Sequence, residues 1–403
     1  MAPVQRPAPS APVYLDYAAT SPLRQGVLEA MLPWLEGGFG NASSVHRLGR
    51  QARVAVERAR EQIADVLGCE GAEVVFTSGG TEADNLALRG VLTSDALREA
   101  GRTGLVTGAA EHEAILQAAG ALERAGHAVQ ILQPGPSGAV SPDRVREALN
   151  EGVGLVSLMA VNNETGTVTD LRAVAELVHK TGVFLHTDAV QAAGLLDLNV
   201  DRLGVDMMSV SAHKCGGPKG IGALYVRSGT PLEAQVAGGA QERRRRGGTE
   251  NVASIVGFAE ALAQADRERE DTRARLASLQ RRLAEQLQAA FGDAVRFNTP
   301  LSGFAEHTAE VSPHVLNVSF PPKDGRALDG EMLLLGLDVA GVCASSGSAC
   351  ASGAVEPSHV LQAMGVPRLA AQATVRFSFG HATTEADVDR AAEVLAQVVG
   401  RMS

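Results

Sequence analysis

The stretch SVSAHKCGGPKGIG, residues 209–222, is the most informative part of this 403-residue chain. An apolar strand expected over Val205–Val210 leads into Lys214, and a glycine-rich turn follows. Burial among uncharged neighbours lowers the pKa of a lysine, so that its amine can act as a nucleophile. The glycines leave room for a bulky ring to approach the backbone. These residues alone leave two interpretations open, a reactive amine or an exposed lysine in a turn.

A second segment, FLHTDAVQ at residues 184–191, favours the reactive amine. A short apolar strand ends at Asp188, and Gln191 follows three residues later. A carboxylate keeps a pyridinium nitrogen protonated, which lets such a ring withdraw electrons. Helix capping is the alternative role for Asp188. An aspartate at one strand end and a lysine at a later strand end together favour a site for a pyridine ring.

A third segment, VVFTSGGTEADN at residues 74–85, predicts a strand, a glycine turn and the start of a helix. Thr81 and Asp84 have the spacing of a capping box, and free N–H groups at a helix start bind anions. No Gly-Lys-Ser/Thr sequence follows, so this is not a nucleotide-binding P-loop. These residues alone leave two interpretations open, a phosphate site at the first turn of this helix or a turn that binds no ligand.

Together the three segments resemble a fold-type-I pyridoxal-phosphate enzyme, and specifically the cysteine desulfurases of the aminotransferase class V superfamily. The resemblance extends from YLDYAATSP at 14–22 to VRFSFG at 375–380. The motifs that carry it include EH at 111–112, VNNETG at 161–166, GGTEN at 247–251 and SSGSAC at 345–350. The resemblance implies an α/β fold, with a mainly parallel seven-stranded-type sheet in a large domain and a smaller α+β C-terminal domain.

The resemblance also implies roles for residues around pyridoxal 5'-phosphate. Lys214 would form a Schiff base with the cofactor aldehyde, Asp188 would pair with the pyridine nitrogen, and Gln191 would approach the ring phenolate. His112 would stack on the ring, although a helix-capping histidine is the alternative. Asn163 would hydrogen-bond the ring or the substrate. The phosphate would be held by Gly80, Thr81, Ser211 and His213, and by Thr249 of the partner subunit in a homodimer.

For the substrate, L-cysteine, the resemblance implies that Arg376 grips the carboxylate, because a guanidinium matches a carboxylate bidentately. Asn41 would also touch the substrate. Lys214 would remove the α-proton, and the exposed Cys350 thiolate would take the sulfur as a persulfide, leaving L-alanine. An iron–sulfur scaffold or a thiolation enzyme would then accept the sulfur. The alternatives are a selenocysteine lyase or another class V enzyme, and a binding protein without turnover.

Composition agrees with a two-domain globular enzyme, since 45% of the residues are hydrophobic and 20% are charged. A net charge of -10 argues against general nucleic-acid binding, and no apolar run is long enough to span a membrane. The four cysteines include no Cys-x-x-Cys pair, so no metal site is expected. We expect free thiols in a reducing cytoplasm. The arginines at 243–246 are interpreted as a loop near anionic ligands.

Helical patterns alternate with short apolar strands, which predicts helices on both faces of the sheet. Residues 1–12 are expected to form a disordered tail. Residues 24–260 would form the large domain, while residues 13–23 and 261–403 would form the small domain that carries the Cys350 loop. A long helical stretch over Ala253–Phe291 would connect the two. Three sets of elements carry this prediction: helices at 51–67, 113–125, 142–150 and 171–181; strands at 74–76, 105–107, 128–132, 155–159 and 184–186; and, near the C-terminus, strands at 315–320 and 374–379 and a helix at 385–401.

Overall fold

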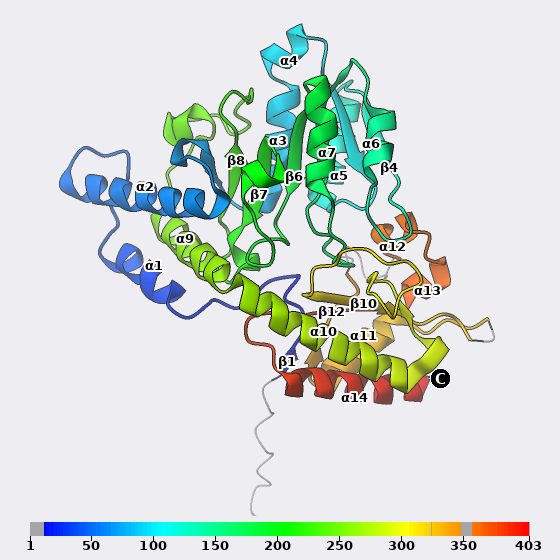
Figure 1. Cartoon of the computed structure of the whole chain (residues 1–403). Coiled ribbons are helices and arrows are strands. Elements are labelled where there is room, and N and C mark those ends of the chain that lie inside the picture. Colours follow the sequence, from blue (N-terminus) through cyan, green and yellow to red (C-terminus); the bar gives the residue numbers. More distant parts are fainter. Residues whose placement is uncertain (1–11, 324, 348–356, 403) are drawn as a thin grey trace, which may run out of the picture.

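A seven-stranded sheet with the strand order β2-β8-β7-β6-β5-β3-β4 forms the centre of the larger part of the molecule (Figure 1). The computed structural model describes residues 12–323, 325–347 and 357–402. Strand β8 runs antiparallel to both neighbours, and the other pairs are parallel, so the expected mainly parallel sheet is confirmed. The strands are β2 (Val74–Thr77), β3 (Gly104–Gly108), β4 (Val129–Leu132), β5 (Val153–Ser157), β6 (Phe184–Asp188), β7 (Met207–Ser211) and β8 (Gly222–Val226).

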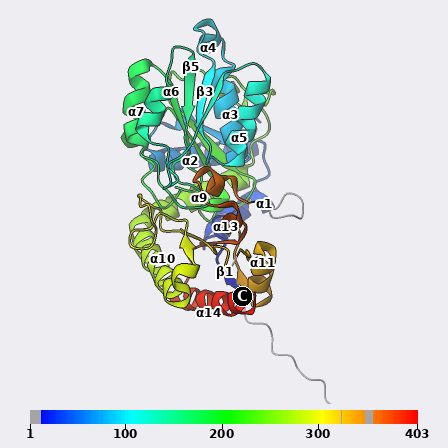
Figure 2. The same ribbon diagram turned by 90° about the vertical axis from the view of Figure 1, so that its right-hand side faces the viewer.

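Helices cover both faces of this sheet because successive strand residues point to opposite sides. Val75 and Leu105 pack into one core and Val74 and Val106 into another, and all four are buried. Figure 2 shows the sheet between α6 and α7 on one side and α3 and α5 on the other. The helices of this part are α1 (Val27–Glu36), α2 (Arg47–Leu67), α3 (Gly80–Leu92), α4 (Asp95–Glu99), α5 (Glu113–Arg124), α6 (Pro142–Ala148), α7 (Leu171–Val178), α8 (Val200–Leu203) and α9 (Val252–Arg267).

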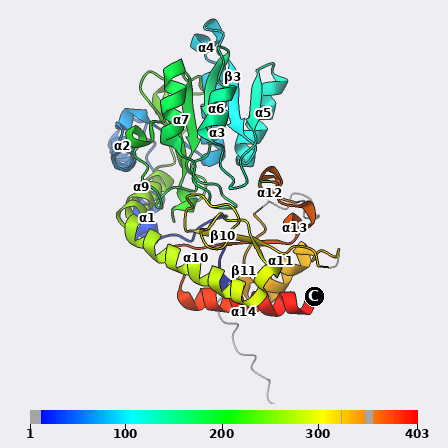
Figure 3. The same ribbon diagram turned by 45° about the vertical axis from the view of Figure 1, so that its right-hand side comes forward.

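A separate hydrophobic core lies below the sheet, under the long helix α10, and α14 runs beside that helix (Figures 1 and 3). It contains the antiparallel sheet β12-β10-β9 and the parallel pair β1-β11. Its strands are β1 (Val13–Tyr14), β9 (Arg296–Phe297), β10 (Val315–Ser319), β11 (Val342–Cys343) and β12 (Thr374–Ser378), and its helices are α10 (Arg269–Phe291), α11 (Gly330–Val339) and α14 (Glu385–Met402). Two short helices, α12 (His359–Ala363) and α13 (Arg368–Gln372), pack with Ala110 in a smaller cluster of their own.

The helical stretch expected over Ala253–Phe291 consists of two helices, α9 and α10, which meet at Glu268. The Glu268 carboxylate accepts a hydrogen bond from Arg24 at 2.5 Å, so the end of α9 is fixed to the segment before α1. The break lets α9 pack on α1 and α2 while α10 packs on α14. Among the described helices, none has the length and apolar character needed to cross a membrane.

Candidate active site

A cavity of about 230 Å³ lies where β6, β7 and the start of α3 meet. The carboxyl ends of the parallel strands form one edge of the sheet, which is where ligands bind in open α/β folds. The cavity brings together many residues expected from the sequence to form one site. Its walls include Gly80, Thr81, His112, Asn163, Asp188, Gln191, Ser211, His213 and Lys214, with Asp84, Met159, Val161 and Val190 between them.

Lys214 ends a short 3-10 turn that follows β7, so the strand fixes the position of its backbone. Its Nζ donates to the carbonyl oxygens of Ala18 at 2.5 Å and Ala19 at 2.9 Å. Burial, with a smaller contribution from the Arg376 charge, lowers the pKa of Lys214 to about 8, although the Asp188 and Asp16 charges oppose the shift. A useful fraction of this amine is therefore neutral near pH 7, as a nucleophile or base requires.

Asp188 is the last residue of β6, and its Oδ1 accepts a hydrogen bond from the Val190 amide at 2.9 Å. Burial raises the pKa of this carboxyl group, while His112 and Lys214 lower it. The carboxylate would gain most from a cation placed directly against it. A protonated pyridine nitrogen supplies such a cation.

The first turn of α3 provides an anion site at the opposite wall. The N–H groups of Gly80 and Thr81 have no acceptor inside the helix, since they belong to its first turn. Ser211 Oγ is buried and has no hydrogen-bond partner. Burial lowers the pKa of His213 to about 4, so this ring is neutral at pH 7 and one of its nitrogens can donate.

The capping box expected from Thr81 and Asp84 was wrong. Helix α3 is capped by Gly79 without a side-chain hydrogen bond, and the Ser78 amide donates to Glu82 instead, at 2.8 Å. Asp84 lies on the buried face of the helix, where one of its oxygens is 3.8 Å from His186 Nε2. Tertiary packing of α3 on the sheet decided the position of this side chain.

His112 caps α5, because its Nδ1 accepts from the Ala114 amide at 3.1 Å, and it also lines the cavity. The His112 side chain is therefore placed to stack on a ring in the cavity, as expected, and it also caps the helix, which was the alternative role. A neutral ring that accepts at Nδ1 carries its proton on Nε2.

Arg376 lies on β12 beside the cavity and is buried, with 4% of its surface exposed. Its guanidinium donates to the Asn163 carbonyl oxygen at 2.8 Å and to Asp16 Oδ1 at 3.0 Å. Its Nε and the side-chain oxygen of Asn163 are buried without partners. This leaves donor capacity for a carboxylate close to the cavity.

Cys350 lies outside the described residues. Gly347, the last described residue before this segment, and Ser358, the second described residue after it, both lie against the Glu164 side chain. Ser358 Oγ donates to Glu164 Oε2 at 2.5 Å, and a Cβ added at Gly347 would lie 2.8 Å from the same oxygen. Since Glu164 follows Asn163, the chain leaves and re-enters the described part beside the cavity.

Comparison with known proteins identifies the family. The model for aminotransferase class V matches residues 13–391. A cysteine desulfurase IscS of Dictyoglomus turgidum is 42% identical over 97% of this chain and 95% of its own length. A putative cysteine desulfurase IscS 1 of Bacillus subtilis is 44% identical over 97% and 99%. A solved NifS-like protein superposes with a TM-score of 0.87 at 34% identity, over 97% of this chain and 100% of its own. The chain belongs to the cysteine desulfurases of the class V aminotransferase family.

The desulfurase depends on pyridoxal 5'-phosphate, and the residues present fit this cofactor. The unpartnered Ser211 hydroxyl and the first amides of α3 suit the phosphate, and the buried Asp188 carboxyl suits the ring nitrogen. Lys214 lines the same cavity. Among the described residues, no group of three or more His, Cys, Asp or Glu side chains is arranged to hold a metal ion.

Two expected site residues lie away from the cavity of their own chain. Asn41 is exposed, and its Oδ1 accepts from the Ser43 amide at 2.8 Å. Thr249 is also exposed and does not line the cavity. The arginines at 243–246 do not line it either: Arg243 contacts Glu57, Arg246 contacts Glu82, and Arg245 donates to a backbone carbonyl.

Several residues of the desulfurase site were not expected from the sequence. Asp16 binds the Arg376 guanidinium, Glu164 lies between the two ends that flank the Cys350 segment, and His314 binds Gln191. Asp16 lay inside a quoted motif, but nothing there indicated its partner. The sequence signal that could have revealed His314 was its own imidazole side chain, which stands in an otherwise apolar stretch.

Proposed function

We propose that this desulfurase converts L-cysteine to L-alanine, with sulfur transferred to Cys350 as a persulfide. The observation that carries the proposal is one cavity that contains a partly buried lysine of lowered pKa, a buried aspartate and, at its edge, a buried arginine. Both ends that flank the Cys350 segment lie beside this cavity. A solved relative, SspA in complex with cysteine, is 35% identical over 91% of this chain and 98% of its own, with a TM-score of 0.75.

Binding and orientation come first in the proposed mechanism. Arg376 holds the substrate carboxylate. The substrate must compete with the Asp16 carboxylate, which binds the same guanidinium in the structure. Asn163 contributes its unpartnered side-chain oxygen to the ammonium group. Bound pyridoxal phosphate supplies an electron sink next to the substrate α-carbon.

Proton transfer falls to Lys214. Its amine is neutral in a useful fraction near pH 8, so it can accept the α-proton and later return a proton to carbon. The Ala18 and Ala19 carbonyl oxygens hold Nζ in place while it carries the extra proton. His112, fixed as the cap of α5, lies in the same cavity and orients the bound ring.

Sulfur transfer falls to Cys350. Its thiolate attacks the substrate sulfur, a sulfur–sulfur bond forms as the carbon–sulfur bond breaks, and the electron pair left on carbon takes up a proton. The other cysteines are poor candidates, because burial raises the pKa of Cys69 and Cys215 to about 12 and raises that of Cys343 as well. A thiol that stays protonated is a weak nucleophile.

The test is the formation of alanine and sulfide from L-cysteine, in the presence of a thiol reductant, by wild type and by Cys350→Ala. We expect equal amounts of both products from wild type and neither from the variant, which keeps the visible absorption of its cofactor. Cys343→Ala is the matched control and should keep activity. Wild-type rates from Cys350→Ala would contradict the persulfide step, and a coloured wild type without turnover would contradict the substrate.

We also propose a homodimer in which Thr249 of the partner subunit reaches the phosphate. Its support is the exposure of Thr249 and of a group of large apolar side chains between residues 28 and 45. Exposed apolar patches mark association surfaces. This group comprises Leu28, Leu32, Leu35, Phe39 and Val45.

The dimer can be tested with Phe39→Asp, since Phe39 is 77% exposed. Sedimentation should show monomers, and the affinity for the cofactor should fall. Val339→Asp, at an equally exposed apolar position on α11, should leave both unchanged. A wild type that is monomeric and binds the cofactor fully would rule the arrangement out.

The sulfur acceptor is proposed to be an iron–sulfur scaffold or a thiolation enzyme, because a protein-bound persulfide transfers its sulfur to another thiol or to a metal-binding site.

We propose a cytoplasmic location, since the described cysteines, Cys69, Cys215 and Cys343, are free thiols and free thiols persist in reducing compartments.

A further inference from the structure

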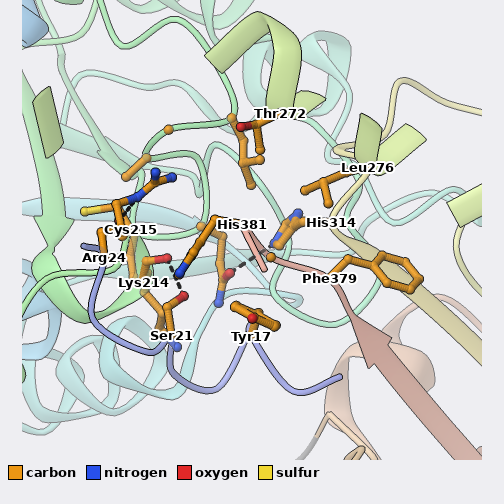
Figure 4. A pocket seen from close by; sticks show the side chains of 16 residues that line it. Tyr17, Ser21, Arg24, Lys214, Cys215, Thr272, Leu276, His314, Phe379 and His381 are labelled. Atoms are coloured by element: carbon orange, nitrogen blue, oxygen red, sulfur yellow. Dashed lines mark hydrogen bonds between the residues drawn. The ribbon is translucent and has the colours of Figure 1, made fainter. Parts of the chain in front are cut away.

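A small cavity of about 40 Å³ is lined by residues of both cores, and two histidines, His314 and His381, line it (Figure 4). Its walls include Tyr17, Gln191, Lys214, His314 and His381. Gln191 and Lys214 line both cavities, so the groups here act on the active site through shared side chains.

The hydrogen bonds of the Gln191 amide assign its orientation. Its Nε2 donates to the Ala18 carbonyl oxygen at 2.9 Å, and its Oε1 lies 3.1 Å from His314 Nε2. An amide oxygen can only accept, so His314 Nε2 must carry the proton. With Ala18 taking one of the two amide N–H groups, the second remains for an acceptor in the cofactor cavity.

The tautomer of His314 is fixed from its other side. Ser312 Oγ lies 2.8 Å from His314 Nδ1, and the hydroxyl donates there because Nδ1 is bare in this tautomer. Burial of the ring, with smaller contributions from the Arg376 and Lys214 charges, lowers the pKa of His314 to about 3. His314 therefore stays a neutral donor throughout the working pH range.

The backbone around this ring is equally constrained. The Phe379 amide donates to the His314 carbonyl oxygen at 2.8 Å, and the Ser312 amide donates to the Gly166 carbonyl oxygen at 2.8 Å. His314 directly precedes β10, so the core that contains α10 and α14 holds it in place. A rigid donor therefore reaches from that core to a side chain of the active site.

We propose that His314 is a positioning residue, which holds the Gln191 amide with its nitrogen toward the cofactor and so sets the hydrogen bond that the ring oxygen receives. The inference rests on the role proposed above for Gln191. Without His314, Gln191 Oε1 is a buried acceptor without a donor, and the amide must move to satisfy it. The hydrogen bond to the ring oxygen then weakens.

The experiment follows the visible absorption of the bound cofactor during a pH titration of the holoenzyme. A donor stabilises negative charge on the ring oxygen, so its loss should raise the pH midpoint of the spectral change. We expect His314→Leu to raise the midpoint by about one pH unit, as suits the loss of one charge-assisted hydrogen bond. His314→Gln, whose Nε2 lies near the position of the histidine Nε2, should restore a midpoint close to that of wild type.

Two further variants make the outcome decisive. His381→Leu changes the other histidine of the small cavity, which contacts the Tyr17 ring at 5.8 Å between centroids, and it should leave the midpoint unchanged. Gln191→Leu should raise the midpoint at least as far as His314→Leu. If Gln191→Leu shifts the midpoint and His314→Leu does not, the positioning role of His314 is wrong, while the role proposed for Gln191 stands. If Gln191→Leu shifts nothing, the role proposed for Gln191 fails with it.

Folding is checked by the melting temperature of each variant. If His314→Leu does not accumulate as folded protein, His314→Asn replaces it. This amide is one methylene shorter than glutamine and stops short of Gln191, so it should shift the midpoint as the leucine variant would. Equal midpoints for the asparagine and glutamine variants would overturn the inference.

Discussion

At the scale of single residues, two carboxyl groups that line the cofactor cavity each disfavour ionisation of the other. Asp84 and Asp188 are both buried, and each has a raised pKa because burial disfavours its ionised form. The Asp188 charge raises the pKa of Asp84 further. Since His112 and Lys214 lower the pKa of Asp188, Asp84 is the group that keeps its proton. The fold therefore carries a neutral carboxylic acid in the same cavity as the aspartate that is proposed to bind the cofactor ring.

We predict that Asp84→Asn stabilises the desulfurase increasingly as pH rises. An unfolded chain ionises Asp84 above about pH 4, whereas the fold keeps it neutral, so the stabilising contribution of this group is present at low pH and lost as pH rises. Asparagine does not titrate. The difference in melting temperature, variant minus wild type, should increase from pH 5 to pH 8. Each kcal/mol of added stability corresponds to roughly 2–4 °C in this difference.

The control for this prediction is Asp65→Asn, which removes an exposed aspartate from α2. Its melting temperature should follow that of wild type across the same range. A constant difference between Asp84→Asn and wild type at every pH would show that Asp84 is ionised in the fold.

Residue positions could be predicted from the sequence where a motif joined a strand end to a known chemistry, as for Lys214 and Asp188. The partners of those residues could not. Ala18 binds both Lys214 and Gln191 through its backbone carbonyl oxygen, and a backbone group carries no signal in side-chain identity. His314 is far from Gln191 along the chain, so only the tertiary fold brings their side chains together.

At the scale of elements, the turn that carries the arginine run has an unusual backbone. Glu242, Arg243 and Arg244 have φ of 44°, 54° and 66°, the left-handed region that favours glycine. A buried ion pair holds the turn, because both Glu242 oxygens accept from Arg60 on α2, at 2.7 and 2.8 Å. The same carboxylate accepts from the Phe76 amide at 2.9 Å, which connects the turn to β2.

We predict that Arg244→Gly raises the free energy of unfolding by about 1 kcal/mol, the cost of one left-handed residue that is not glycine. Arg245 is the matched control, since its φ is −88°. Arg245→Gly should lower the free energy of unfolding by about 0.5–1 kcal/mol through backbone entropy. Denaturant titration measures both, and a loss of stability in Arg244→Gly would mean that the arginine side chain makes a necessary contact.

Elements could be predicted from the sequence wherever hydrophobic periodicity was strong. The helix expected at residues 113–125 appears as Glu113–Arg124, and the strand expected at 128–132 appears as Val129–Leu132. The break between α9 and α10 was missed because no proline or glycine marks it. It depends instead on a contact between Glu268 and Arg24, which are distant in sequence.

At the scale of the whole molecule, the division into a large unit, residues 24–260, and a small unit, residues 13–23 and 261–403, stays a prediction. Two separate hydrophobic cores are present, but Ala261, Leu262 and Ala265 of α9 pack in the core of the large sheet, beyond the boundary proposed at residue 260. The segment 13–23 makes contacts with both parts of the molecule. Leu15 packs in the core with α10 and α14, while Ala18 and Ala19 accept the Lys214 amine. Tyr17 stacks edge-on against Tyr14 and His381.

We predict that Gly380→Ala displaces this segment. A Cβ at Gly380 would lie 1.9 Å from a ring carbon of Tyr17, so either the ring or the chain must move, at a cost of about 1–3 kcal/mol or more. The melting temperature should fall, and the affinity for pyridoxal phosphate should fall with it because the Lys214 partners shift.

Gly400→Ala is the control, because that glycine lies in α14 with open space around its Cβ position. It should stabilise the enzyme by about 0.5–1 kcal/mol through helix propensity. Wild-type cofactor affinity in a destabilised Gly380→Ala enzyme would show that Tyr17 does not place the Lys214 partners.

The pairing of β1 with β11 has a consequence for biosynthesis. The ribosome makes Val13 long before its partner Val342, a wait of roughly 20–60 s at ordinary rates. The sheet from β2 to β8 and its covering helices emerge complete well before β11 is made. We therefore expect the nascent chain to fold its large sheet first, and to pair β1 and bind its cofactor only after β11 has been synthesised.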